Sequence, residues 1–239
     1  MKRTFALALV LSLAPSLRAF AAEAVATSIA TNGGHASSTA TAVGNARATS
    51  TAVATNGGRA ISNSEAVGRR NGFAVSDSLA IADRGLSVSN SRAHAVGRRG
   101  GAAVAMSDSV AVTVGGVAIS NSDADARGRF GGFANSRSSS LAMSRHGVAI
   151  SDSGARSNGY FGGNAVAESE SVSDTIGGMA TSHVRSDSEA GWRGSAYSNG
   201  FGFSASGPHR SSRARVVATS RANRFGNARV DSAAIEVRR

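Results

Sequence analysis

The chain has 239 residues, no cysteine, 29 glycines, only 5% aromatic residues and a formal net charge of +11. So few large apolar residues exclude a thick globular core, because such cores are built by burying Leu, Ile, Phe and Trp. The lack of cysteine excludes disulfide staples, so stability has to come from backbone hydrogen bonding and repetition.

Residues 1–22 have the layout of a secretory signal peptide. Lys2 and Arg3 give a positive start, residues 5–14 form an apolar run, and a small-residue cleavage site ends at Ala21 or Ala22. The run is much shorter than the roughly 20 apolar residues that span a bilayer. The sequence therefore predicts export, a secreted or cell-surface location, and no transmembrane segment after cleavage.

Residues 23–207 are predicted to form one repeat domain. The glycines that open successive units alternate between two spacings that differ by one position, so every second glycine returns at a constant interval: Gly85, Gly101, Gly116, Gly132, Gly147, Gly163, Gly178 and Gly194. The string GVAISNSDADARGRFGGF from Gly116 returns as GVAISDSGARSNGYFGGN from Gly147. A fixed period of this length is typical of solenoids, whose units pack mainly on their neighbours.

Small residues alternate with varied ones inside each half-repeat. Ala118, Ser120 and Ser122, for example, are interleaved with Val117 and Ile119. A period of two predicts β-strands, and the glycine pairs between the runs predict turns. The expected fold class is all-β: a parallel β-solenoid (β-helix or β-roll) of 31-residue repeats made of two 15–16-residue halves.

Two features of this solenoid stay open at the level of sequence. One coil is either the whole 31-residue repeat or one of its halves, although the two kinds of half-repeat end differently, which favours the whole repeat. The set of alanines and serines faces either inward or outward. We expect it to face inward, because the other set also carries Arg, Asp and Glu, which are rarely buried.

The positive charge is concentrated in residues 208–239, an Arg-rich segment that is predicted to form the last solenoid coil. It has 8 arginines against 2 acidic residues, whereas residues 23–207 have 15 against 13. Arginine presents a planar fork to phosphate, sulfate or carboxylate. The candidate residues for binding a polyanion or nucleic acid are Arg210, Arg213, Arg215, Arg221, Arg224 and Arg229.

Several half-repeats share a short pattern of Asn or Asp, then Ser, then any residue, then Ala. Examples are NSEAVG from Asn63, DSLAIA from Asp77 and NSRAHAVG from Asn90. Over residues 57–200 the chain resembles the head repeats of trimeric autotransporter adhesins, which build a tight parallel β-roll. The resemblance implies trimer formation and binding to matrix or cell surfaces. The heptad stalk and the C-terminal membrane anchor of that family have no counterpart in the sequence.

The closing turns of alternate half-repeats give the candidate surface for binding partners. Equivalent positions of successive repeats form a column of arginine and aromatic side chains, which together can stack on sugars, bases or anionic polymers. The alternative is that the aromatic rings fold over the corner of the solenoid and shield it. The candidates are Arg98, Arg99, Arg129, Phe130, Tyr160, Phe161, Trp192 and Arg193.

Catalytic and metal-binding patterns are not expected. The five histidines lie in different units without ligand spacing, and no serine sits in a nucleophile elbow. We therefore expect no enzyme activity and no cofactor or metal. The expected function is that of an exported structural or adhesive protein that presents its residue ladders to a surface or to copies of itself, as a trimer or fibre. The alternatives are ice binding by a regular hydroxyl surface and polyanion binding by the C-terminal segment.

Overall fold

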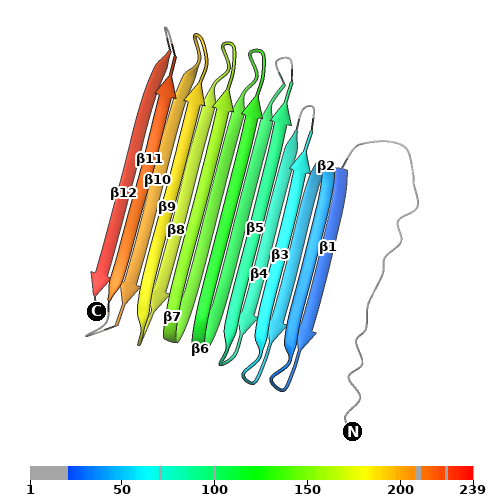
Figure 1. Cartoon of the computed structure of the whole chain (residues 1–239), viewed down its shortest axis with the longest axis vertical. Coiled ribbons are helices and arrows are strands. Elements are labelled where there is room, and N and C mark those ends of the chain that lie inside the picture. Colours follow the sequence, from blue (N-terminus) through cyan, green and yellow to red (C-terminus); the bar gives the residue numbers. More distant parts are fainter. Residues whose placement is uncertain (1–20, 70–71, 99–100, 208–210, 224–225, 239) are drawn as a thin grey trace.

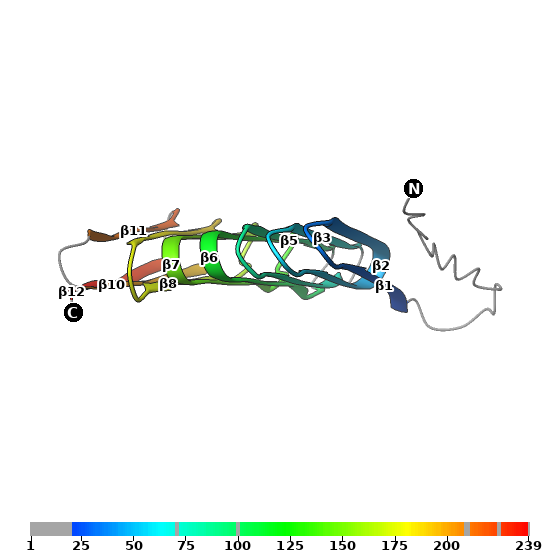
Figure 2. The same ribbon diagram turned by 90° about the horizontal axis from the view of Figure 1, so that it is seen from below.

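The computed structural model describes residues 21–69, 72–98, 101–207, 211–223 and 226–238. Within them the chain is a flat parallel β-solenoid, which runs down one layer of strands, turns at an edge and returns up a second layer (Figures 1 and 2). It makes about six turns. No helix long and apolar enough to cross a membrane occurs in this described part. The expected all-β solenoid is confirmed.

The described residues form a set of consecutive strands with short turns between them. These strands are β1 (Ala21–Ala30), β2 (His35–Ala54), β3 (Arg59–Gly68), β4 (Phe73–Ala82), β5 (Leu86–Gly97), β6 (Ala103–Gly128), β7 (Ala134–Gly159), β8 (Ala165–Thr175), β9 (Met179–Ala190), β10 (Ser195–Ser206), β11 (Ser212–Ala222) and β12 (Asn227–Arg238). The predicted signal segment lies outside the described residues except for Ala21 and Ala22, which begin β1.

The strands form two layers, which we call face 1 and face 2. Face 1 consists of β1, β4, β8, β10 and β12 with the downward halves of β2, β6 and β7 (residues 45–54, 103–113 and 134–144). Face 2 consists of β3, β5, β9 and β11 with the remaining halves of those three strands (35–44, 117–128 and 148–159). The C-terminal β11 and β12 thus continue the two layers by pairing with β9 and β10.

Glycine lets β6 and β7 round their corners without a break. Gly116 and Gly147 have φ of 144° and 155°, which is unfavourable for a residue with a side chain. A Cβ on Gly147 would also collide with the backbone oxygen of Gly116, the equivalent glycine of the preceding coil. These recurring glycines therefore set both the corner and the close stacking of successive coils.

The strand register shows that one coil is the whole 31-residue repeat over most of the solenoid. Ala103 pairs with Ala134, Ala134 with Ala165, and Val117 with Val148. The first coils are shorter, because His35 already pairs with Arg59. The expected repeat of two unlike halves is confirmed, and the alternative of one coil per half-repeat is wrong.

The interior is built almost entirely of alanine and serine, as expected from the alternation. Ala60, Ala118 and Ala149 are fully buried, and so are Ser62 and Ser120. Such small side chains fit between two closely spaced sheets, while Val, Ile, Asn, Asp and Arg point outward. The repeated SDS and SNS strings are therefore interior packing, with their serines inside and the Asp or Asn between them outside.

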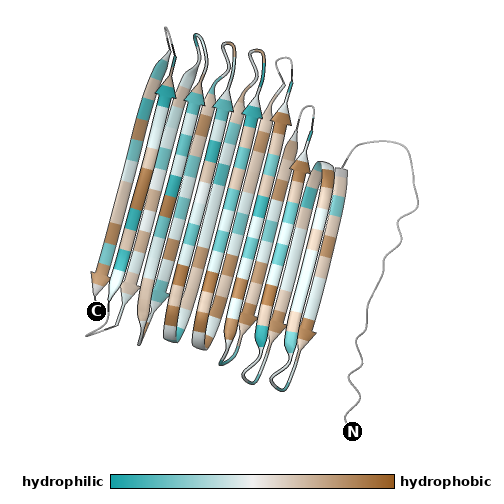
Figure 3. Cartoon of the chain, in the orientation of Figure 1, coloured by the Kyte–Doolittle hydropathy of each residue, from teal (hydrophilic) through white to brown (hydrophobic). Residues whose placement is uncertain are grey.

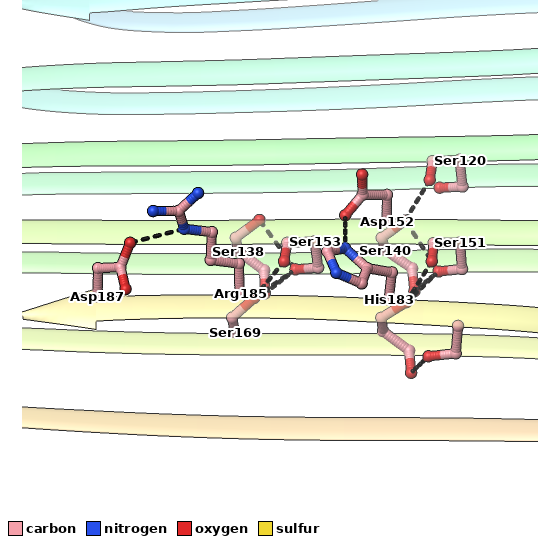
Figure 4. A network of polar contacts seen from close by, with 12 residues as sticks. Ser120, Ser138, Ser140, Ser151, Asp152, Ser153, Ser169, His183, Arg185 and Asp187 are labelled. Carbon is pink, nitrogen blue, oxygen red and sulfur yellow. Dashed lines mark hydrogen bonds and ion pairs between the residues drawn. The ribbon is translucent and has the colours of Figure 1, made fainter. Parts of the chain in front are cut away.

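Most of the buried serine hydroxyls in the described strands are hydrogen-bonded, many of them in two rows that cross from face to face, whereas those of Ser136 and Ser212 have no partner. In one row Ser107 donates to Ser91 (2.9 Å), Ser122 to Ser107 (3.0 Å), and Ser138 to Ser122 (2.9 Å). Figure 4 shows later members of both rows, where Ser153 donates to Ser138 and other serines to backbone oxygens. Because unpaired buried hydroxyls are costly, these rows favour one register of the two sheets. We call them the serine rows.

One serine row ends at Val184 of β9. Val184 and Val216 occupy inward positions that hold serine in earlier coils, and the strand opposite has glycine at positions 200 and 202. A Cβ on Gly200 would lie 2.7 Å from Cγ1 of Val216 and 3.3 Å from Cγ1 of Val184. The two glycines thus provide the space that the larger valines need.

Candidate functional site

The closing turns at the upper edge of the slab in Figure 1 bring the predicted aromatic residues together. We call this edge, made of turns 129–133, 160–164 and 191–194 with Arg98, the aromatic edge. The rings of Phe130 and Phe161 are stacked, with centroids 5.3 Å apart and planes 6° from parallel. They come together because the coil register places equivalent residues of successive repeats on neighbouring rungs.

The aromatic rings of this edge are exposed. Phe130 is 62% exposed and Phe161 65%, and Tyr160 and Trp192 are exposed as well. The guanidinium of Arg193 lies over the Trp192 ring, 4.6 Å from its centroid, which is a cation–π contact. The rings therefore present much of their surface to solvent.

The backbone of these turns is held in a conformation that side chains rarely adopt. Phe130, Phe161 and Arg193 have φ of 56°, 53° and 59°. The left-handed region costs an ordinary residue about 1–2 kcal/mol relative to the right-handed one, whereas glycine adopts it freely. The aromatic edge thus carries bulky exposed side chains at positions where glycine would strain the chain less.

Positive charge surrounds the rings. Arg129 makes no ion pair with any described carboxylate, and the described closing turns contain no acidic residue. Arg127 at the end of β6 contacts Asp125 (2.8 Å) and, together with Arg129, borders a hollow of about 310 Å³. The rings of Phe130, Tyr160 and Phe161 form the rest of that hollow. Arg98 is exposed in the preceding coil, and Arg99 lies outside the described residues.

The predicted polyanion-binding arginines are divided between the two faces. Arg213, Arg215 and Arg221 point outward from face 2 on β11, and all three are exposed. Arg229 points outward from face 1, where it pairs with Asp231 (3.0 Å) and approaches the Tyr197 ring. Arg210 and Arg224 lie outside the described residues. The described members therefore do not form one patch.

A shallow polar groove of about 700 Å³ runs along face 2. An amide ladder contributes to it: Asn90 donates to Asn63 and Asn121 to Asn90, both over 2.8 Å. Further along, His183 contacts Asp152 (3.1 Å) and Arg185 contacts the nearby Asp187 (2.7 Å), as Figure 4 shows. These groups largely satisfy one another, as expected of ladders of stacked residues.

Two carboxyl groups on the outward side of β6 have pKa values shifted in opposite directions. Burial raises the pKa of Asp123, and Arg92 only partly offsets this. Burial by itself would also raise the pKa of Asp125, but hydrogen bonds from His94 and Arg127 hold it below its usual range. Neither carboxyl belongs to a group of three or more potential metal ligands. No such group occurs among the described residues.

Face 1 carries an apolar stripe beside the turns at the lower edge of the slab. Strand register aligns its members in two neighbouring columns. The recurrence of outward apolar residues at equivalent positions of successive coils accounts for this alignment, which Asp174 of β8 interrupts in the column of Met143. Figure 3 has face 2 in front, and the brown segments near the lower edge show that this nearer face also has apolar residues there, where Val117 pairs with Val148 and Ile119 with Ile150. The apolar stripe consists of Ile29, Val53, Leu79, Ile81, Val110, Val112, Leu141, Met143, Val172, Phe203 and Ile235.

The chain matches no family model, no curated protein and no solved structure. Its likeness to trimeric autotransporter heads therefore stays a prediction from the sequence pattern.

Proposed function

We propose that this is an exported, non-catalytic structural or adhesive protein that associates with copies of itself or with an external surface. The observation that carries the proposal is the apolar stripe of face 1. Side chains such as Ile81 and Met143 are 37% and 41% exposed, on a flat sheet whose interior needs none of them. Contiguous exposed apolar surface of this kind is typical of interaction sites.

Other features of the chain support this proposal. The signal-peptide layout of residues 1–22 supports export, and the hydrogen-bonded interior supports a rigid body that remains folded without disulfides. The outward residues vary from coil to coil, whereas the interior repeats. A regular interior with a varied surface is more typical of a scaffold that displays side chains than of a protein that forms a reaction centre.

The ice-binding alternative loses its main support. It relied on a regular surface of small hydroxyl residues, but the regular serines are buried between the sheets. We therefore do not retain it as a proposal.

The mass of the purified processed chain in solution tests the proposed association. Light scattering over a range of concentrations is expected to show assemblies larger than one chain. The variant Ile81→Lys with Met143→Lys is expected to shift them to monomer, because it places two charges in the stripe. Thr41→Lys adds a charge to face 2 and is the control. A wild-type protein that is monomeric at every concentration would refute self-association through the stripe.

A further inference from the structure

We infer that the aromatic edge binds chains of acidic sugars, with carboxylate groups held by arginine and the sugar rings resting on the aromatic side chains. The inference deepens the proposed adhesive function by naming the class of ligand. It uses a different surface from the apolar stripe, at the opposite edge of the slab.

The hollow at the aromatic edge has the chemistry that this ligand needs. A pyranose ring has one relatively apolar face, and Phe130, Tyr160 and Phe161 offer an exposed apolar floor. Arg129 stands at the border of that floor without an ion pair to a described carboxylate. Guanidinium groups bind carboxylates through two parallel hydrogen bonds, so the acid group of the sugar fixes its orientation.

The geometry of the solenoid adds a reason why the ligand should be a chain. Equivalent turns recur once per coil and therefore lie about 4.8 Å apart along the axis, the spacing of hydrogen-bonded strands. A polymer that follows the axis meets the Phe130 turn, the Phe161 turn and then Trp192 with Arg193. Several weak contacts to one chain combine into much tighter binding.

The ring arrangement favours sugars over nucleic acid bases. Phe130 and Phe161 are already stacked on each other at 5.3 Å, so no base can enter between them without separating the pair. Single-stranded nucleic acids are held by a basic groove that follows the phosphates, together with bases that stack on free aromatic faces. A sugar needs only the outer surface of the stack and of Tyr160.

Two edges of the same molecule provide a matched test. Arg129 lies at the aromatic edge, and Arg145 lies exposed at the corner of β7 on the opposite edge, again without an ion pair to a described residue. Binding of the processed chain to polygalacturonate is measured at low salt for wild type, Arg129→Ala, Arg145→Ala and the double variant Phe130→Gly with Phe161→Gly. Neutral dextran and a single-stranded oligothymidylate are the comparison ligands.

We expect polygalacturonate to bind and dextran not to bind. Arg129→Ala and the double glycine variant are expected to raise the Kd at least tenfold, whereas Arg145→Ala changes it less than twofold. Glycine suits the left-handed backbone at both positions, so the double variant should keep its strand spectrum and its state of association, which separates this test from that of the apolar stripe.

Three results would overturn the inference. The first is equal loss of binding in Arg145→Ala, which would indicate general charge attraction. The second is equal binding of dextran, which would remove the role of the acid group. The third is that the oligothymidylate binds more tightly than polygalacturonate and that the double variant abolishes this binding. That result would make the edge a nucleic acid site.

Discussion

Glu236 of β12 accepts a hydrogen bond from the backbone N–H of Ala214 in β11, over 2.9 Å. β12 is the last described strand of face 1 and packs across the interior on β11, the last strand of face 2, and Glu236 lies on the inward side of β12. Its carboxylate accepts the hydrogen bond of a backbone N–H on the edge of β11. Without Glu236 that N–H would be available to pair with another strand. Inward-pointing charges at sheet edges are a known means of preventing such pairing.

Glu236→Ala is expected to increase association through the C-terminal end of the solenoid. The change frees the Ala214 N–H and removes the charge, so a strand of another molecule can pair there. Light scattering as a function of concentration measures the effect. Asp231→Ala removes the same charge from the outward side of β12 and is the control. Equal behaviour of the two variants would contradict the role of Glu236.

Ser138 tests the contribution of the serine rows. It donates to Ser122 and accepts from Ser153, so Ser138→Ala is expected to lower the free energy of unfolding by about 0.5–1.5 kcal/mol. Ser138→Val adds bulk to a tightly packed interior and is expected to cost about 1–3 kcal/mol more. Urea unfolding gives both values. Ser139→Ala, on the outward side of the same strand, should change stability by less than about 0.5 kcal/mol.

Gly200→Ala is expected to destabilise the protein by about 1–3 kcal/mol, although replacing glycine in a strand usually stabilises it. The added Cβ would press against Val216 and Val184. Val216→Ala removes the nearer contact, so the double variant should be more stable than the sum of the single changes predicts. A double-mutant cycle measures this coupling, and an additive result would show that the valines do not need the space.

At position 161 we expect the glycine variant to be more stable than the alanine variant. Both substitutions lose the ring stack with Phe130, which is worth about 0.5–1.5 kcal/mol. Only glycine relieves the left-handed backbone, so Phe161→Gly should be about 1 kcal/mol more stable than Phe161→Ala. Thermal unfolding of the two variants provides the comparison. The reverse order would mean that the turn relaxes out of this conformation when the ring is removed.

Asp123 and Asp125 are expected to affect the pH dependence of stability in opposite ways. The pKa of Asp125 is lowered in the folded chain, so its contribution is present above the unfolded pKa and disappears as the pH falls through the folded value. The pKa of Asp123 is raised, so its ionised form opposes folding at neutral pH, and that penalty begins to shrink as the pH falls through the folded value and is gone below the unfolded value.

The corresponding amide variants should therefore differ in sign at neutral pH. Asp125→Asn is expected to lower the free energy of unfolding and Asp123→Asn to raise it. Both differences should shrink in acid, where the native carboxyls are protonated too. Unfolding in urea at neutral and acidic pH checks this, and two variants with the same sign at neutral pH would contradict it.

The sequence predicts the parts of this structure that depend on repetition. The alternation around Ser120 and Ile119 gives strands and their inward side, and the regular return of glycine gives the register. The stack of Phe130 on Phe161 follows from that register, because identical spacing places both residues at the same corner.

The remaining features depend on which strand of face 1 packs against which strand of face 2. This pairing cannot be read from either segment of the sequence alone. Val184 and Gly200 belong to strands of different faces, so their fit appears only once the two layers are placed together. Arg215 and Arg229 look like members of one basic segment, but the turn between β11 and β12 sends them to opposite sides. The apolar stripe, by contrast, lies within one face and follows from the same strand register as the stack of Phe130 on Phe161.

The difference in length between early and late coils has a consequence for how such a protein can change. β2 passes from face 2 to face 1 at Gly44 with no inserted turn, whereas later coils cross that edge through several extra residues, including Phe130 and Phe161. The inward alanines keep their pairing in both cases. The length of a turn at this edge can therefore change while the stacked body beneath it keeps its pairing, but neighbouring turns have to change together where they are bonded to each other, as the Gly131 N–H is to the Tyr160 oxygen.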